Sequence, residues 1–371
     1  MSLGIRADAV FSIRLSEMPM PTGSTDPVVL TDWILHSLGL IRRMDENGGL
    51  QRIMRDSLLA DPLRGWTSSS LGEATGLSNT AIFQQIKKLK RAGLVSTETR
   101  GKWDYHILRG GSMSNAVAIS MSLASTILDM RLSTLAGMVE PSETRMEVAP
   151  EDEEGPSLSI TISEVGPRRE GFDETSTLAM GLGLGGGSES GIELASKLLE
   201  TLCSDHHPVT LLALSERLKT TRGRVKTAID RMVEAGIVET VPMVQRLSMD
   251  IFSGLNRQNS ARGTDWLMGR GGLSRLDDSV SSALIQTLSD GDGIERVADI
   301  LAKVPVESQR ILLNQLGGRM PWGYRLSGKD GKAVSETVSR AVDRSLRRIR
   351  TVAKRLDDSL ATKRISHIEE Q

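Results

Sequence analysis

The segment 66–111 constrains the fold of this chain most strongly, because its capping residues, its apolar spacing and its turn residues all agree. Hydroxyl residues at positions 67–70 can cap a helix, and Ser70 with Glu73 has the spacing of a capping box. Gly76 supplies the left-handed residue on which helices often end. We therefore predict a short helix that begins near residue 68 and stops at a tight turn.

A second helix is predicted over 79–92, with Ser78 as its cap. Ile82, Ile86 and Leu89 recur at intervals of four and three, which places them on one buried stripe. The other faces carry the polar, basic and aromatic residues Asn79, Thr80, Phe83, Gln84, Lys87, Lys88 and Arg91.

A β-hairpin is predicted after Gly93, with strands at 94–99 and 103–108 that are rich in Val, Thr, Trp, Tyr and Ile. Arg100, Gly101 and Lys102 form its tip. Residues 79–109 hold seven lysines and arginines against two acids, a net charge of +5 in a chain whose net charge is −1. The positive charge of the chain is thus concentrated on this helix and hairpin.

The motifs LGEATGLS at 71–78, AGLV at 92–95 and RGK at 100–102 resemble those of winged helix-turn-helix transcription regulators of the ArsR and MarR type, most clearly over 50–135. The resemblance implies binding of double-stranded DNA, although winged helices also serve as protein-docking modules. Helix and hairpin tip would share one DNA-facing surface. The predicted contact residues are Ser78, Asn79, Thr80, Phe83, Gln84, Lys87, Lys88, Arg91, Arg100 and Lys102.

Composition argues against several other functions. Aromatic residues make up 3% of the chain, too few for the stacking platforms of single-strand binders. No catalytic triad, acidic pair or phosphate loop stands out, so we expect neither enzymatic activity nor a cofactor.

A metal-sensing cluster of Cys203, Asp205, His206 and His207 is less favoured than a buried cysteine beside surface imidazoles, because only one thiolate is available. With no signal peptide and no long apolar run, we expect a cytoplasmic protein that does not enter a membrane.

The regions around this segment are predicted from composition. Residues 1–27 read as a mobile segment with one strand-like run at 9–15, and 28–138 as the first winged-helix domain. Its trailing apolar helix at 114–135 either forms a dimer interface or covers its own domain.

Residues 139–190 hold twelve acids against three bases and read as a linker, with one strand-like run at 157–165. Gly181, Gly183 and Gly186 match a dinucleotide-binding spacing, but no strand leads into them, which favours the linker interpretation.

The architecture is predicted to repeat over 191–275. Helices at 192–204, 211–218 and 222–235 are followed by AGIV at 235–238, and RG at 262–263 with DW at 265–266 would continue the second hairpin. Lys219 replaces the turn glycine, while Asp230 and Glu234 stand where the first copy has Lys87 and Arg91. The second copy is therefore expected to bind DNA less well, with a secondary contact set of Arg222, Arg224 and Lys226.

The C-terminal region 276–371 is predicted to be helical, at 279–288, 294–301, 307–316 and 333–360. The run WGYRL at 322–326 resembles the strand 103–108, which makes a degenerate third winged helix one interpretation. The last helix carries a narrow apolar seam with basic flanks. It would pair with a second subunit or pack on its own domain. We predict a homodimer.

The sequence thus predicts a mostly α protein with small β-hairpins, built from tandem winged helix-turn-helix domains and a helical C-terminal region. It favours a transcription regulator that binds double-stranded DNA; a ligand that controls it is not identified. The alternatives are a protein-interaction scaffold, which the near-neutral net charge favours, and a replication initiator, although such chains are generally more basic.

Overall fold

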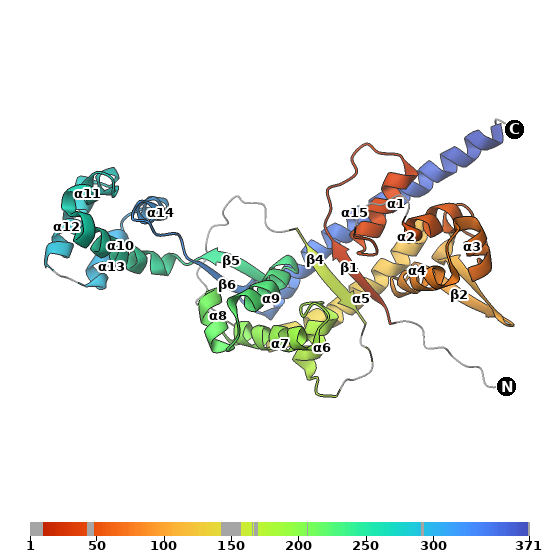
Figure 1. Cartoon of the computed structure of the whole chain (residues 1–371), viewed down its shortest axis with the longest axis horizontal. Helices are drawn as coiled ribbons and strands as arrows, with labels where there is room; N and C mark the ends of the chain where they lie inside the picture. Colours follow the sequence, from red (N-terminus) through yellow and green to blue (C-terminus); the bar gives the residue numbers. More distant parts are fainter. Residues whose placement is uncertain are drawn as a thin grey trace.

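The computed structural model describes residues 10–42, 48–141, 157–164, 166, 170–205, 207–290 and 293–369, with side chains up to residue 362. This part of the chain is mostly helical, with three two-stranded antiparallel sheets, as predicted for the fold class. The elements fall into two halves of like order and a separate helical lobe (Figure 1).

The first half contains a strand, helices, a hairpin and a long helix, in that order. Thr67 and Ser70 form the capping box of its α3, so the pair is not Ser70 with Glu73. Gly76 ends α3 in the left-handed conformation, and Ser78 caps α4, both as predicted. The elements are β1 (Ser12–Ser16), α1 (Pro27–Ser37), α2 (Gly49–Ile53) with a π-helical turn (Met54–Leu58), α3 (Ser68–Thr75), α4 (Asn79–Arg91), β2 (Val95–Arg100), β3 (Trp103–Leu108) and α5 (Met113–Met138).

The second half repeats this order, but its hairpin is interrupted between the strands. Its elements are β4 (Ser159–Ser163), α6 (Glu174–Gly181), α7 (Glu189–Ser204), α8 (Leu211–Arg217), α9 (Arg222–Glu234), β5 (Val238–Pro242), β6 (Trp322–Leu326) and α15 (Gly331–Glu369). The interruption holds α10 (Leu247–Arg262), α11 (Thr264–Met268), α12 (Asp278–Asp290), α13 (Ile294–Leu301) and α14 (Val306–Gln315). These five helices surround a hydrophobic core of their own and form the lobe at the left of Figure 1.

Backbone contacts show that β6 completes the second hairpin. β6 pairs with β5 along its whole length, and Tyr324 bridges to Val209 as His106 of β3 bridges to Trp66. The interpretation of 322–326 as part of a third copy is therefore wrong. The residues 262–263 and 265–266, predicted to continue the second hairpin, lie instead at the end of α10 and in α11. The three predicted helices at 279–288, 294–301 and 307–316 are confirmed as α12, α13 and α14.

Two strands of nearly the same sequence join the halves. SIRLSE at 12–17 and SITISE at 159–164 each open one half, and β1 pairs with β4 in antiparallel fashion with Arg14 opposite Thr161. Because these two residues hold the same place in the motif, the ladder is symmetric about them: the second residue of each strand faces the fourth residue of the other. The halves are thus joined as the subunits of a twofold dimer would be.

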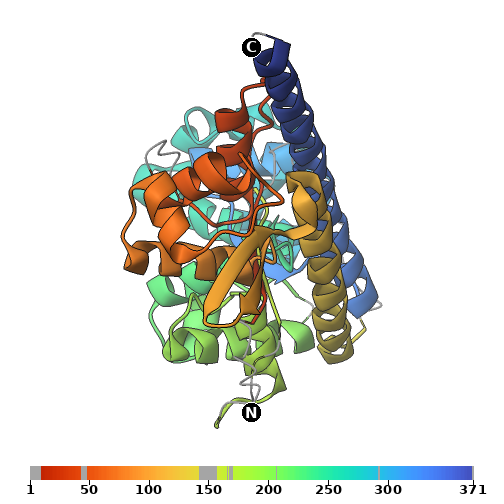
Figure 2. The same cartoon turned by 90° about the vertical axis from the view of Figure 1, so that its right-hand side faces the viewer.

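The trailing helices α5 and α15 pack side by side in opposite directions (Figure 2). The Asp357 carboxylate of α15 accepts hydrogen bonds from the backbone N–H groups of Met113 and Ser114 at 3.0 and 2.8 Å, and so caps the first turn of α5. Near the other end, the Ser335 hydroxyl donates to the Leu132 carbonyl at 3.1 Å. By length and composition α5 could span a membrane, contrary to the expectation that no apolar run is long enough, and half of its most apolar stretch is buried in the protein.

The apolar seam of α15 is buried within the chain. Val342, Leu346, Ile349, Ala353 and Leu356 are all at most 5% exposed, and α15 packs on α5 and α1. The expectation that this seam pairs with a second subunit is therefore wrong, because the other half of the same chain already covers it.

Two regions predicted to be loose are part of the core. Phe11, Ile13 and Leu15 are buried, and the Trp33 indole donates to the Pro19 carbonyl at 2.7 Å, so the described residues from 10 onward are not a mobile segment. Residues 1–9 and 142–156 lie outside the described part. In the predicted linker, β4 and α6 are packed, and Gly183 closes the turn after α6 against the Thr161 side chain. This is a helix-to-helix turn, and the dinucleotide interpretation gains no support from it.

Lys219 provides a stability test of the repeat. It occupies the position of Gly76 and, among the described residues, is the one non-glycine residue with positive φ, at 49°. An L side chain in this conformation costs about 1 kcal/mol. We expect Lys219→Gly to raise the unfolding free energy by up to about 1 kcal/mol in urea titrations. Lys219→Ala, which keeps a Cβ, is the control; equal effects would show that removal of the charge is the cause.

Candidate nucleic-acid interface

Helix α4 presents a polar, basic face to solvent because its opposite side is anchored in the core. Ile82, Ile86 and Leu89 are buried as predicted, each at most 4% exposed. The Ser78 hydroxyl accepts the Ala81 N–H at 3.3 Å and fixes the start of the helix. All seven residues predicted on the other faces are exposed: Asn79, Thr80, Phe83, Gln84, Lys87, Lys88 and Arg91. Such a face has the composition and width that a major groove accepts.

The β2–β3 hairpin brings both tip cations to the surface. Arg100 is engaged, because its guanidinium donates to the Glu98 carboxylate at 2.8 Å. That hydrogen bond lowers the pKa of Glu98 and raises the pKa of Arg100. Lys102 is exposed, with its Nζ 5.1 Å from the ring centroid of Trp103, and this indole is itself 51% exposed. At the tip, Lys102 is therefore directly accessible to a ligand, whereas Arg100 would first have to break its hydrogen bond with Glu98.

His106 ties the hairpin to the rest of the half. Its backbone exchanges hydrogen bonds of 2.8 and 2.7 Å with Trp66, and its Nδ1 lies 2.9 Å from the Thr97 hydroxyl. Burial lowers the pKa of His106, so the ring is neutral at neutral pH. This residue serves to position the hairpin and adds no charge to the surface.

The second half presents a weaker basic surface at α9. Arg222 and Arg224 are exposed, but the Lys226 ammonium is held by Asp230 at 2.8 Å, a hydrogen bond that raises the pKa of the lysine. Glu234, at the place of Arg91, lies 4.0 Å from Arg14. Of the secondary contact residues, the structure leaves Arg222 and Arg224 available and engages Lys226. The tip of this hairpin is occupied by the α10–α14 lobe.

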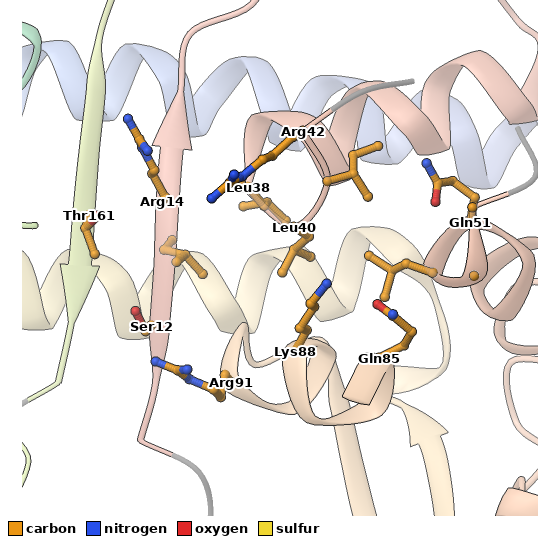
Figure 3. A pocket seen from close by; sticks show the side chains of 16 residues that line it. Ser12, Arg14, Leu38, Leu40, Arg42, Gln51, Gln85, Lys88, Arg91 and Thr161 are labelled. Atoms are coloured by element: carbon orange, nitrogen blue, oxygen red, sulfur yellow. The ribbon is translucent and has the colours of Figure 1, made fainter. Parts of the chain in front are cut away.

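Two cations beside α4 were not predicted as site residues. Arg14 of β1 and Arg42 of the turn after α1 line an open pocket of about 770 Å³ together with Lys88 and Arg91 (Figure 3). The pairing of β1 with β4 across 147 positions brings Arg14 there, which no local pattern near α4 could indicate. The repeated SI-x-[LI]-SE motif is the signal that could have shown β1 to be a packed strand.

The described residues among those considered for metal binding form no cluster of three possible ligands. Cys203 is buried, and burial raises the pKa of its thiol to about 12, so it is protonated at neutral pH. Asp205 accepts a hydrogen bond from Arg217 at 2.7 Å. His206 lies outside the described residues, and within the described part no three His, Cys, Asp or Glu residues could together hold a metal ion.

No protein-family model matches the chain, and comparisons with curated proteins and with solved structures found no match either.

Proposed function

We propose that the chain is a DNA-binding transcription regulator of the cytoplasm, without enzymatic activity, whose first half is a winged helix-turn-helix. The observation that carries the proposal is the exposed face of α4 together with the β2–β3 tip. Five cations are exposed there, of which Arg100 is paired with Glu98: Lys87, Lys88, Arg91, Arg100 and Lys102. Helix α4 would enter a major groove with Gln84 at base edges, and the tip would flank the adjacent minor groove.

The first half supplies most of the affinity in this proposal. Asp230 neutralises Lys226 on α9, and Glu234 would face phosphates where the first half has Arg91. The α10–α14 lobe also stands between β5 and β6, where the first hairpin has its basic tip. Arg222 and Arg224 can add phosphate contacts next to the main site but cannot match its charge.

In this proposal a single chain takes the role that two subunits play in the winged-helix regulators that it resembles. With each half acting as a winged helix, the symmetric β1–β4 ladder and the antiparallel α5–α15 pair would relate α4 and α9 as the recognition helices of a twofold dimer are related. Because the halves differ in charge, the preferred DNA site would be asymmetric, with one strongly bound half-site. This arrangement makes a homodimer unnecessary for reading two neighbouring grooves.

The rival function is a scaffold that docks proteins through the same surface. Two exposed aromatic residues favour it, since Phe83 is 63% exposed on α4 and Trp103 is 51% exposed at the hairpin. Titration of duplex genomic fragments at two salt concentrations separates the two functions. DNA binding through the five cations requires an affinity that falls steeply with salt. Weak binding with little salt dependence would favour the scaffold.

The Glu98–Arg100 pair leads to a prediction at the hairpin tip. Glu98→Gln should strengthen DNA binding several-fold, because it frees Arg100 and removes a negative charge that would lie near phosphates. Arg100→Ala should weaken binding. Fluorescence anisotropy with one duplex checks both variants, and Glu73→Gln on the exposed side of α3 is the control for loss of one carboxylate. Unchanged affinity in Glu98→Gln and Arg100→Ala would remove the tip from the interface.

A further inference from the structure

The pocket beside α4 combines several positive charges from described segments that are distant in the sequence. Lys88 reaches into it from α4, Arg42 comes from the turn after α1, and Arg91 points toward β1 (Figure 3). Arg14 lies on the rim, where its guanidinium donates to the Ser159 hydroxyl at 3.0 and 3.1 Å and also lies 4.0 Å from the Glu234 carboxylate. None of the described residues that line the pocket is acidic. An anion entering it would meet cations from three separate segments.

The floor of the pocket is apolar. Leu40 and Ile41 line it with part of their side chains exposed, Ile13, Leu38 and Leu50 add little surface because they are buried in the core, and Leu40 lies between Arg42 and Lys88. An inorganic ion would leave this apolar surface in water. A compound that covers this apolar surface and also carries negative charge would gain binding free energy from burial of the surface and from contact with the cations.

The corresponding place in the second half is closed, so the pocket is not a general consequence of the fold. There Arg231 replaces Lys88, and its guanidinium packs on the turn after α6: a Cβ on Gly186 would lie 2.5 Å from it. A Cβ on Gly185 would likewise lie 2.6 Å from the Ile192 backbone, so that this turn fills the space. Thr161 and Glu234 occupy the places of Arg14 and Arg91. The half with the weaker basic surface thus fills this place with Arg231 and the turn after α6.

We propose that this pocket binds a small organic polyanion: a compound with two or more negative charges, such as phosphate groups, on an apolar or aromatic body. The charged groups would lie among Arg42, Lys88 and Arg91, and the body would lie on Leu40 and Ile41. Phosphate groups suit this site because arginine donates to them in pairs and lysine adds a further charge.

The ligand would oppose DNA binding, an extension that rests on the proposed function. Lys88 and Arg91 belong both to the pocket and to the exposed face of α4. A bound polyanion would neutralise them and place negative charge beside the DNA phosphates. By linkage, DNA would lower the affinity for the ligand by the same factor.

The probe is mantATP, a fluorescent nucleotide that carries a triphosphate and two ring systems, titrated into the full chain without DNA. We expect saturable binding in the micromolar range, displaced by ATP far better than by pyrophosphate, which lacks the body, or by adenosine, which lacks the charge. Arg42→Gln and Lys88→Gln should each raise the Kd by about tenfold or more. Arg340→Gln, at an exposed arginine of α15, is the control for an equal change of charge and should leave the Kd unchanged.

Absence of mantATP binding would overturn the proposal. So would a Kd that Arg42→Gln and Lys88→Gln leave unchanged, or that Arg340→Gln raises as much. Displacement by pyrophosphate as effective as by ATP would show that an ion suffices and would overturn the assignment of an organic ligand.

The relation to DNA is tested separately, with ATP added to a preformed complex of the chain with a duplex. We expect ATP to raise the Kd for DNA in the wild type and to have little effect in Arg42→Gln, whose DNA affinity alone should change less than twofold. If Arg42→Gln weakens DNA binding as much as mantATP binding, the pocket is a site for the DNA backbone and the proposal fails. If the chain binds no DNA but binds mantATP as described, the proposed function fails and the pocket stands.

Discussion

Ile349→Asp should lower the unfolding free energy by about 4 kcal/mol, because it replaces a fully buried side chain between the two halves with an unpaired carboxylate. Leu346, Ala353 and Leu356 on the same apolar seam are also buried. Urea unfolding followed by circular dichroism measures the change.

The control is Thr351→Asp, two residues away on the same helix, where the side chain is exposed and the change of charge is the same. It should cost at most about 0.5 kcal/mol. An Ile349→Asp variant that keeps the stability of the wild type would contradict the packing of α15 on α5. If the molecular mass measured by sedimentation also fell, from two chains in the wild type to one chain in Ile349→Asp, the seam would be an interface between subunits.

The Lys87→Ala/Arg91→Ala variant should bind duplex DNA roughly tenfold or more weakly at low salt, for every sequence tested. Loss of two phosphate contacts should also reduce the slope of log K against log salt by about 1.8, at about 0.9 for each contact. Gln84→Ala should instead reduce discrimination between sequences and leave the slope unchanged, because a glutamine reads base edges and neutralises no phosphate. Anisotropy titrations at four salt concentrations measure both quantities.

Arg340→Ala/Arg344→Ala is the matched control for the loss of two cations. These exposed arginines lie on α15 beside the middle of α5. Their loss should leave the slope within error of the wild type. If both double variants change the slope equally, the binding is a response to net charge, and α4 is not the contact.

The sequence was most informative where the determinants of structure are local. Ser78, Ile82 and Gly93 lie within one helix and its two ends, so capping, periodicity and a left-handed residue could be recognised from 16 consecutive positions. The hairpin is also local, since β2 and β3 are separated by only two residues. The exposure of the predicted α4 residues follows from the same register.

Pairing over long distances could not be predicted in the same way. β1 packs against β4, and the acidic composition between them favoured a linker although both strands alternate apolar and polar residues. β6 was recognised as strand-like at Trp322, but the lobe between β5 and β6 separated it from its partner. The seam of α15 gave a correct prediction of an apolar interface, while the choice between α5 and a second subunit depends on tertiary structure that periodicity does not contain.

Sedimentation equilibrium of the chain with one fluorescent duplex, selected for tight binding from genomic fragments, tests most directly whether a single chain binds DNA through its first half. We predict a free protein of 40.3 kDa and a saturated complex of one chain per duplex, which dissociates as salt is raised and fails to form with Lys87→Ala/Arg91→Ala at the same concentration. A complex that contains two chains, or one that the double variant forms as readily as the wild type, would contradict the account.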